Sequence, residues 1–247
     1  MGLTGIQIFK MLPQTNCKEC GAATCLAFAM NLAAGKAELD SCPYVSDEAR
    51  EKLSEASAPP IRPVKIGKGV RERTVGGETV EYRHEKTFFN QPAFAAVINS
   101  DIAEEDLKNK LAVFNAFQYD RVGFNLRPEL LAVKDVNQDA QAFAQTAKTI
   151  AETSEFNLVL MSEDKAVMEA GLEACKFKRP LIYAATKDTV DDFGQLAKDN
   201  EVPLAVKGTS VDEVMELSDK LTGMGVKDLV LDSGAREIKQ CFEDQVG

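Results

Sequence analysis

Four cysteines near the N-terminus constrain this chain more than any other feature of its sequence. They are spaced C-x2-C-x4-C-x16-C, at Cys17, Cys20, Cys25 and Cys42. No histidine lies near them, so a centre bound here would have sulfur ligands only, as structural zinc sites and iron–sulfur clusters can have. Zinc ribbons usually present two C-x2-C pairs, and this segment has one. We therefore expect a [4Fe–4S] cluster, with structural zinc, disulfides and free thiols as the alternatives.

Composition and charge argue against several other classes of protein. The 247 residues carry 29 basic and 39 acidic side chains, giving a net charge of −10, and no basic stripe is present. Nucleic acid is therefore not an expected partner. No segment has the pattern of a secretory signal or approaches the length of a membrane span. We expect a soluble, cytoplasmic protein with no membrane association, in which a disulfide framework is disfavoured.

The remaining cysteines and the single histidine are not expected to bind metal. Cys175 and Cys241 are isolated in the sequence, so we expect buried or partly buried thiols. His84 stands among charged residues and is expected at the surface.

Short helical patterns surround the four cysteines and predict a small helical module over residues 1–57. The expected helices are Gly5–Met11 with Thr4 as N-cap, Cys25–Ala34 opened by Thr24 and followed by Gly35 as C-cap, and about 47–55 with Ser46 as N-cap. A module of this size has little core of its own, so the cluster would supply part of its stability.

A proline-rich stretch marks the end of this module. Pro59, Pro60 and Pro63 fall within five residues and favour an extended, semi-rigid spacer. We expect residues 58–91 to form a linker and an irregular cover, in which residues 64–90 form either a β-hairpin or irregular structure.

From Pro92 onward, short apolar runs alternate with amphipathic helical patterns. The predicted strands are Phe94–Ile98, Leu130–Val133, Leu158–Met161, Leu181–Ala184, Leu204–Val206 and Leu229–Leu231, with Val122–Leu126 as a possible addition. The predicted helices lie near 102–117, 138–153, 164–174, 189–199 and 210–223. This pattern predicts an α/β fold with a parallel sheet covered by helices. No glycine-rich fingerprint follows the first strand, which argues against a dinucleotide-binding fold.

The regular β–α units, each about 25 residues long, fit a (β/α)8 TIM-type barrel over residues 92–247. About six of the eight strands can be counted, so the barrel is expected to be incomplete in this chain. Asp232 and Arg236 lie beyond the carboxyl end of a predicted strand, where barrel enzymes place their chemistry. A loop salt bridge or a helix cap is the preferred interpretation of this pair, and no catalytic residue is predicted.

Stretches along the whole chain carry a family resemblance. They are Leu3-Thr4-Gly5, Asn16-Cys17, Glu19-Cys20-Gly21, Thr24–Met30, Asp40–Ser46, Asn157–Met161, Leu181–Thr186 and Leu229–Glu237. Together they resemble the large (gamma) subunit family of the corrinoid iron–sulfur protein. That protein belongs to the acetyl-CoA decarbonylase/synthase (CO dehydrogenase/acetyl-CoA synthase) system.

The resemblance implies a methyl carrier with two cofactors. Cys17, Cys20, Cys25 and Cys42 would hold a [4Fe–4S] cluster that returns cob(II)amide to cob(I)amide, and a corrinoid would carry the methyl group. The implied partners are a small subunit, with which the chain would form a heterodimer, a methyltetrahydrofolate- or methyltetrahydropterin-dependent methyltransferase, and acetyl-CoA synthase/CO dehydrogenase. Such a subunit is a component of a corrinoid-dependent methyltransferase system and is not expected to turn over alone.

The corrinoid is the point at which this chain departs from the family. It is expected to end before the last barrel strands and before a corrinoid-binding domain, and it contains no Asp-x-His-x-x-Gly stretch. The alternative function is a free-standing [4Fe–4S] electron-transfer protein with a barrel-like docking domain.

Overall fold

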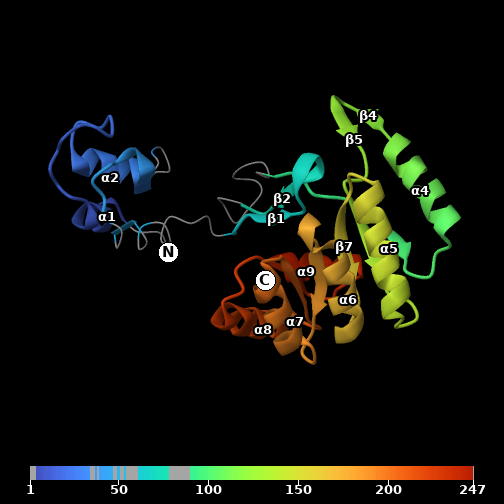
Figure 1. The fold of residues 1–247 in the computed structure, drawn as a ribbon. Helices are drawn as coiled ribbons and strands as arrows, with labels where there is room; N and C mark the ends of the chain where they lie inside the picture. The colour runs from blue at the N-terminus through green and yellow to red at the C-terminus, as the bar shows by residue number, and fades with distance from the viewer. Residues whose placement is uncertain are drawn as a thin grey trace. The chain divides into compact units, whose positions relative to one another are not determined.

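The computed structural model describes residues 4–33, 37, 39–46, 49–50, 53, 61–77 and 90–246, and these fall into two compact units (Figure 1). The first unit ends before residue 63, and the second begins at Pro63. Several predicted features lie outside the described residues: Gly35 as a C-cap, Pro59 and Pro60 of the linker, His84, and most of the helix at 47–55.

The first unit is built on two short helices, α1 (Gly5–Met11) and α2 (Cys25–Ala33). Thr4 caps α1 as predicted: its hydroxyl accepts from the Gln7 N–H, and the Gln7 side chain accepts from the Thr4 N–H. Gly5 lets the helices approach closely, because a Cβ there would lie 2.3 Å from the sulfur of Met30.

A small core lies between these helices and the segment that follows η1 (Leu39–Ser41). Its fully or largely buried members are Ile8, Leu12, Cys25, Phe28, Ala29, Cys42, Val45, Ala49 and Leu53. The Ser46 hydroxyl accepts from the Ala49 N–H at 3.3 Å, which confirms Ser46 as a cap.

The second unit contains a six-stranded sheet in which every neighbouring pair is parallel. Its strands are β3 (Ala95–Asn99), β6 (Leu130–Lys134), β7 (Asn157–Met161), β8 (Leu181–Ala185), β9 (Leu204–Lys207) and β10 (Leu229–Asp232). All six predicted strands are confirmed. Their order is β3-β6-β7-β8-β9-β10, so each strand is added beside the one before it in this sheet. A closed barrel is not seen among the described residues, because β3 and β10 each pair on one side only.

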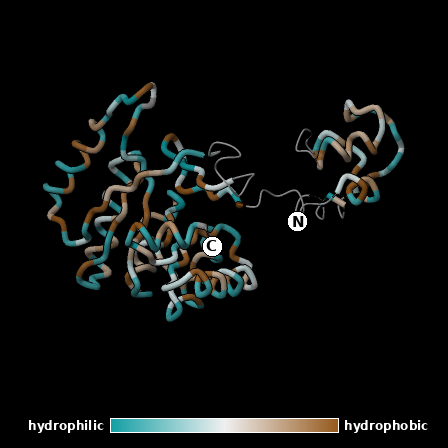
Figure 2. The backbone as a smooth tube through the Cα atoms, turned by 180° about the vertical axis from the view of Figure 1, so that it is seen from behind, coloured by the Kyte–Doolittle hydropathy of each residue, from teal (hydrophilic) through white to brown (hydrophobic). Residues whose placement is uncertain are grey.

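Helices follow the strands and cover one face of this sheet. They are α4 (Glu104–Ala116), α5 (Ala140–Thr153), α6 (Lys165–Cys175), α7 (Val190–Asn200) and α8 (Val211–Met224), which contribute to the larger core. A further helix, α9 (Ile238–Val246), follows β10. α5 and α6 lie side by side (Figure 1). Apolar and polar stretches alternate along the helices in Figure 2, as in amphipathic helices that bury one side.

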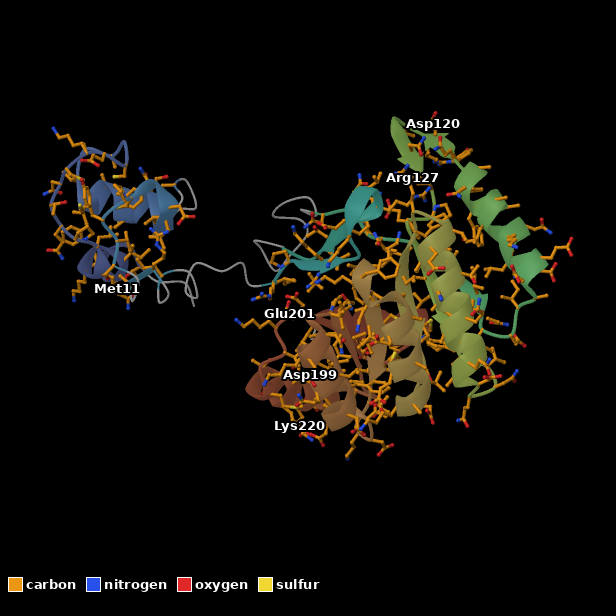
Figure 3. All side chains as sticks on the ribbon, viewed as in Figure 1. Met11, Asp120, Arg127, Asp199, Glu201 and Lys220 are labelled. Carbon is orange, nitrogen blue, oxygen red and sulfur yellow. The ribbon has the colours of Figure 1, made fainter. Side chains whose placement is uncertain are left out.

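Alternate residues of the strands therefore enter two different cores. Leu131 and Val133 of β6 face the helices and join the larger core, with Phe143 of α5 among its fully buried members. Leu130 and Ala132 belong to a smaller core on the opposite face. Charged side chains such as Asp199 and Lys220 stand on the outside of α7 and α8 (Figure 3).

The predicted hairpin covers the smaller core. It consists of β1 (Val64–Ile66) and β2 (Arg73–Val75), joined through η2 (Gly69–Arg71). Val64 and Ile66 are buried against the opposite sheet face. The Lys68 N–H donates to the Asn157 side chain at 3.1 Å. Asn157 opens β7, so the hairpin contacts the end of the sheet at which the strands begin.

A second hairpin replaces the additional strand expected at Val122–Leu126. β4 (Tyr119–Arg121) and β5 (Phe124–Leu126) form their own antiparallel pair, outside the parallel sheet. Val122 and Gly123 make the turn with φ of 47° and 81°. Among the residues that the structure describes, no helix combines the length and the hydropathy that a membrane span needs.

Candidate metal centre

The four cysteines all lie in the first unit. Cys17 and Cys20 stand in the loop between α1 and α2, Cys25 is the first residue of α2, and Cys42 follows η1 directly. All four are free thiols. Cys25 and Cys42 are buried, Cys20 is half-buried and Cys17 is exposed, so the set runs from the small core to the surface.

The loop between the helices is strongly curved. Gln14, Asn16 and Lys18 have φ between 52° and 68°, and Gly21 has φ of 80°. The Gly21 N–H donates to the Lys18 carbonyl at 3.0 Å, closing a turn that contains Cys20. A Cβ at Gly21 would meet nothing within 4 Å, so open space borders this turn.

Two contacts, made of three hydrogen bonds, connect the cysteine-bearing segments. The Asn16 side-chain oxygen accepts from the Cys25 N–H at 2.8 Å, and the Asn16 N–H donates to the Cys25 Sγ at 3.4 Å. The Tyr44 hydroxyl donates to the Glu19 carboxylate at 3.0 Å. Neither contact was predicted, because both join residues that are separated in the sequence.

Hydrogen bonding and negative charge near Tyr44 raise the pKa of its hydroxyl. The hydrogen bond to Glu19 raises the pKa of the Tyr44 hydroxyl, and the charge of Glu19 adds to it. Smaller contributions come from the Cys17 and Cys42 thiolates. The hydrogen bond between Tyr44 and Glu19 therefore joins the second and fourth cysteine segments.

These residues fit an iron–sulfur cluster by their donor set, although the structure, which describes all four cysteines, does not bring three of them together at one point. Among the described residues, no three cysteine, histidine or carboxylate side chains stand close enough to hold a single metal ion. In a [4Fe–4S] cubane each cysteine thiolate binds a different iron atom, and a set of four thiolates without histidine matches that requirement. Two of the four thiols are buried at the core, where a bound cluster would be shielded from water.

The other two cysteines lie in the second unit, as buried and partly buried thiols. Cys175 is fully buried, its Sγ donates to the Gly171 carbonyl at 3.2 Å, and burial raises its pKa to about 12. Cys241 is half-buried, and its Sγ donates to the Ala235 carbonyl at 3.3 Å. Both therefore serve as controls for the four cysteines of the loop.

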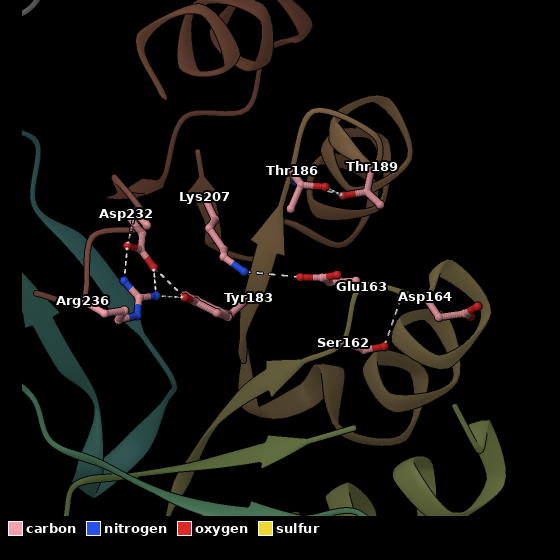
Figure 4. A network of polar contacts seen from close by, with 10 residues as sticks. Ser162, Glu163, Asp164, Tyr183, Thr186, Thr189, Lys207, Asp232 and Arg236 are labelled. Atoms are coloured by element: carbon pink, nitrogen blue, oxygen red, sulfur yellow. Dashed lines mark hydrogen bonds and ion pairs between the residues drawn. The ribbon is translucent and has the colours of Figure 1, made fainter. Parts of the chain in front are cut away.

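A polar hollow of about 420 Å³ lies at the carboxyl end of the parallel strands. At its border Arg236 binds Asp232 through two bonds of 3.0 and 2.9 Å, and the Tyr183 hydroxyl donates to Asp232 at 2.5 Å (Figure 4). Arg236 above all lowers the pKa of Asp232 to about 2, and burial above all raises that of Tyr183 to about 12. Asp232 and Arg236 therefore form a salt bridge. Tyr183, which the sequence did not indicate, hydrogen-bonds to the same carboxylate.

The carboxylates around this hollow already have partners. Asp135 accepts from Ser162 at 2.8 Å, and Glu163 pairs with Lys207 at 3.3 Å. Asp164 accepts from the Val167 N–H and caps α6. We assign no catalytic residue to the hollow.

Two family models match the chain. The model for "CO dehydrogenase/acetyl-CoA synthase delta subunit" matches residues 63–246, and the model for "Putative Fe-S cluster" matches residues 12–44, which include all four cysteines. The match boundary near residue 63 coincides with the boundary between the two compact units.

Individual relatives are similar over nearly the whole chain. The corrinoid/iron–sulfur protein large subunit of Moorella thermoacetica is 45% identical over 99% of this chain and 55% of its own length. The acetyl-CoA decarbonylase/synthase complex subunit gamma of Methanopyrus kandleri is 36% identical over 94% of this chain and 50% of its own length. The acetyl-CoA decarbonylase/synthase complex subunit gamma 2 of Methanosarcina thermophila is 37% identical over 97% of this chain and 52% of its own length. The chain thus spans about half the length of the curated relatives it matches.

Proposed function

The chain belongs to the CO dehydrogenase/acetyl-CoA synthase delta subunit family, and on that premise we propose that it is the iron–sulfur part of a corrinoid methyl carrier. The methyl group would pass from a methyltetrahydrofolate- or methyltetrahydropterin-dependent methyltransferase to acetyl-CoA synthase. The observation that carries the proposal is the C-x2-C-x4-C-x16-C set, which lies in a unit of its own.

Cys17, Cys20, Cys25 and Cys42 would hold a [4Fe–4S] cluster in this role. The cluster supplies one electron at low potential, which would restore cob(II)amide to cob(I)amide after an accidental oxidation. The polypeptide would bury two of the thiolates in the core of the first unit and leave Cys17 near the surface. With Cys17 exposed and Cys25 and Cys42 buried, electrons would leave the cluster on the side of Cys17.

The cluster would occupy a domain separate from the sheet. We propose a cluster module at 1–57, a linker and cover at 58–91, and a barrel domain at 92–247. The hairpin within residues 61–77 packs on the sheet rather than on the helices of the first unit, so the division between the two would precede Val64. A separate module suits a cluster that approaches the corrinoid to reduce it and leaves it during methyl transfer.

The sheet would be part of a (β/α)8 barrel. Doubly wound sheets reverse their strand order and carry helices on both faces. This sheet runs in sequential order and buries helices on one face, while its other face has a small apolar core. Two further strands between β10 and β3 would close the barrel, whichever polypeptide segment contributes them.

The corrinoid itself does not fit the residues of this chain. The sequence has one histidine, His84, followed by Glu85-Lys86-Thr87, so no Asp-x-His-x-x-Gly stretch is available. We propose that the corrinoid is bound outside these 247 residues, by the C-terminal corrinoid-binding domain that the family resemblance implies. Acetyl-CoA synthase/CO dehydrogenase and the methyltransferase would be the successive partners of the assembled carrier.

Electron delivery provides the test of this function. Anaerobically reduced protein, mixed with cob(II)alamin, should remove the cobalt(II) electron paramagnetic resonance (EPR) signal in proportion to the chain added. Cys175→Ala should behave as wild type, and Cys42→Ala should not reduce cobalt. Persistence of the cobalt(II) signal with fully reduced wild-type protein would refute the proposal.

The alternative is an electron-transfer protein that has no corrinoid partner. The same cysteine set supports it, because such clusters occur in many redox proteins. Co-purification of the chain from its native cells with a cobalt-containing subunit would favour the methyl carrier. Recovery of the cluster protein without cobalt would favour the alternative.

A further inference from the structure

Asn16 connects the segment that carries Cys17 to the segment that carries Cys25 through hydrogen bonds. It precedes Cys17, and its side-chain oxygen accepts from the Cys25 N–H at 2.8 Å. Its own backbone N–H donates to the Cys25 Sγ at 3.4 Å. One residue thereby fixes the start of α2 against the loop and supplies a hydrogen bond to a thiol sulfur.

Glu19 and Tyr44 join the second segment to the fourth. Glu19 precedes Cys20, and Tyr44 lies two residues after Cys42. The Tyr44 hydroxyl donates to Glu19 at 3.0 Å across a sequence separation of 25 residues. The two contacts together link all four cysteine-bearing segments in pairs.

We propose that Asn16 and the Glu19–Tyr44 pair are positioning residues, which hold the four segments in place for cluster assembly and retention. We also infer that the Asn16 N–H bond to Cys25 raises the reduction potential of the bound cluster. Both inferences rest on the proposed [4Fe–4S] cluster at Cys17, Cys20, Cys25 and Cys42.

Two physical effects support these roles. Segments that are already joined lose less conformational freedom when a ligand binds them, so the ligand is held more tightly. An N–H donor to a ligand sulfur stabilises negative charge, and the reduced cluster carries one more negative charge than the oxidised cluster. Asn16 also suits the backbone, because asparagine tolerates its φ of 52° better than most residues do.

Asn16→Gly is the direct test, since glycine keeps the left-handed backbone and removes the side chain. The full chain should be loaded anaerobically and challenged with an iron chelator. Loss of one hydrogen bond predicts cluster release about fivefold faster than in wild type. Without the side-chain bond the loop is no longer fixed against the start of α2, so the backbone N–H bond from residue 16 to the Cys25 Sγ should weaken. The potential, measured by EPR-monitored titration, should therefore become more negative. Asn16→Asp keeps an acceptor oxygen and should release the cluster at the wild-type rate.

Gln14→Gly is the matched control for the backbone. Gln14 also has a left-handed conformation, with φ of 55°, and its side chain contacts the Phe9 carbonyl at 3.3 Å rather than a cysteine. This variant should match wild type in release rate and in potential. Equal release rates and potentials for Asn16→Gly and Gln14→Gly would overturn the role of Asn16.

Tyr44→Phe tests the second contact, with Tyr119→Phe as its control. Both tyrosines are about half exposed, at 53% and 54%, and Tyr119 lies in the other unit. Tyr44→Phe should hasten cluster release severalfold, and combining it with Glu19→Ala should add little to either change alone. Additive effects, or release equal to that of Tyr119→Phe, would overturn this pair.

The wild-type measurement separates this inference from the proposed function. Wild-type protein that takes up no iron and sulfide would refute both. Wild-type protein that holds a cluster, with variants indistinguishable from their controls, would refute only the positioning roles.

Discussion

Asp232 shows how a single side chain is fixed at the edge of the parallel sheet. Its carboxylate accepts from Arg236 and Tyr183 and from the Gly234 N–H at 2.9 Å. The bond to Arg236 contributes most to a pKa of about 2, against 3.8 for an ordinary aspartate. In the folded protein the Asp232 side chain is therefore ionised at every pH near neutrality.

The stability that Asp232 provides should depend on pH. Because its folded pKa is depressed, the stabilisation is complete above about pH 4 and is lost as the pH falls towards 2. Allowing for solvent screening, Asp232→Asn should cost about 1 kcal/mol at pH 6 and nothing near pH 2. Urea unfolding at several pH values, followed by circular dichroism, measures this difference.

A surface aspartate provides the comparison for that experiment. Asp199→Asn changes an exposed carboxylate whose hydrogen bond comes from Gln195 on the same helix. It should leave the unfolding free energy nearly unchanged at both pH values. An Asp232→Asn effect that does not vary with pH would contradict the assigned electrostatics.

Local contacts at this scale were predictable from the sequence, and long-range contacts were not. Thr4 and Ser46 were identified as caps because a cap acts on an N–H two or three residues ahead. The Asn16 and Tyr44 contacts, and the place of Tyr183 beside Asp232, join residues that only the folded chain brings together.

At the scale of the element, the β1–β2 hairpin packs against the end of the sheet at which the parallel strands begin. Gly67 lies directly against Asn157, where a Cβ would be 2.0 Å from the side chain, and its N–H donates to the Arg179 carbonyl at 2.9 Å. Asn157 is fully buried, so it cannot move aside without disturbing β7. The hairpin is therefore held by one close contact as well as by apolar burial.

Gly67→Ala should destabilise the second unit by about 3 kcal/mol, from backbone strain together with overpacking. Gly69→Ala is its control, because Gly69 has nearly the same φ, 81° against 82°, and nothing within 4 Å of a Cβ. Gly69→Ala should cost only about 1 kcal/mol of strain. Equal losses in denaturant unfolding would show that the contact with Asn157 does not matter.

The elements were more predictable than their partners. All six parallel strands were found because each gives a near-continuous apolar run of three to five residues, as strands of parallel sheets do. The pairing of β5 with β4 was not predicted, because a strand of three residues carries too little pattern to show whether it joins a sheet or a local hairpin. The strand count was also predictable, since the sequence indicated about six strands and an incomplete barrel, and the described strands form an open sheet of six.

At the scale of the whole molecule, the two edges of the sheet leave apolar side chains in water. Val97 of β3 is 54% exposed and Leu231 of β10 is 59% exposed. On α9, Ile238 and Phe242 are exposed as well, at 89% and 70%. Exposed edges and apolar helix faces favour association with other chains or segments.

We therefore expect the isolated chain to self-associate. Replacing Ile238 with Lys and Phe242 with Glu should shift the mass measured by light scattering towards the monomer. Val122→Lys alters a residue that is 87% exposed on the β4–β5 turn, outside the six-stranded sheet, and should leave the mass unchanged. A wild-type chain that is monomeric at high concentration would contradict the proposed open edges.

The central claim is that Cys17, Cys20, Cys25 and Cys42 hold one [4Fe–4S] cluster, and iron and sulfide analysis tests it most directly. Anaerobically prepared protein should contain about four iron and four sulfide per chain, and reduction should produce a spin-half signal at low temperature. Cys42→Ala should abolish or degrade the cluster, while Cys175→Ala should leave it intact. One zinc per chain with no sulfide would contradict the account.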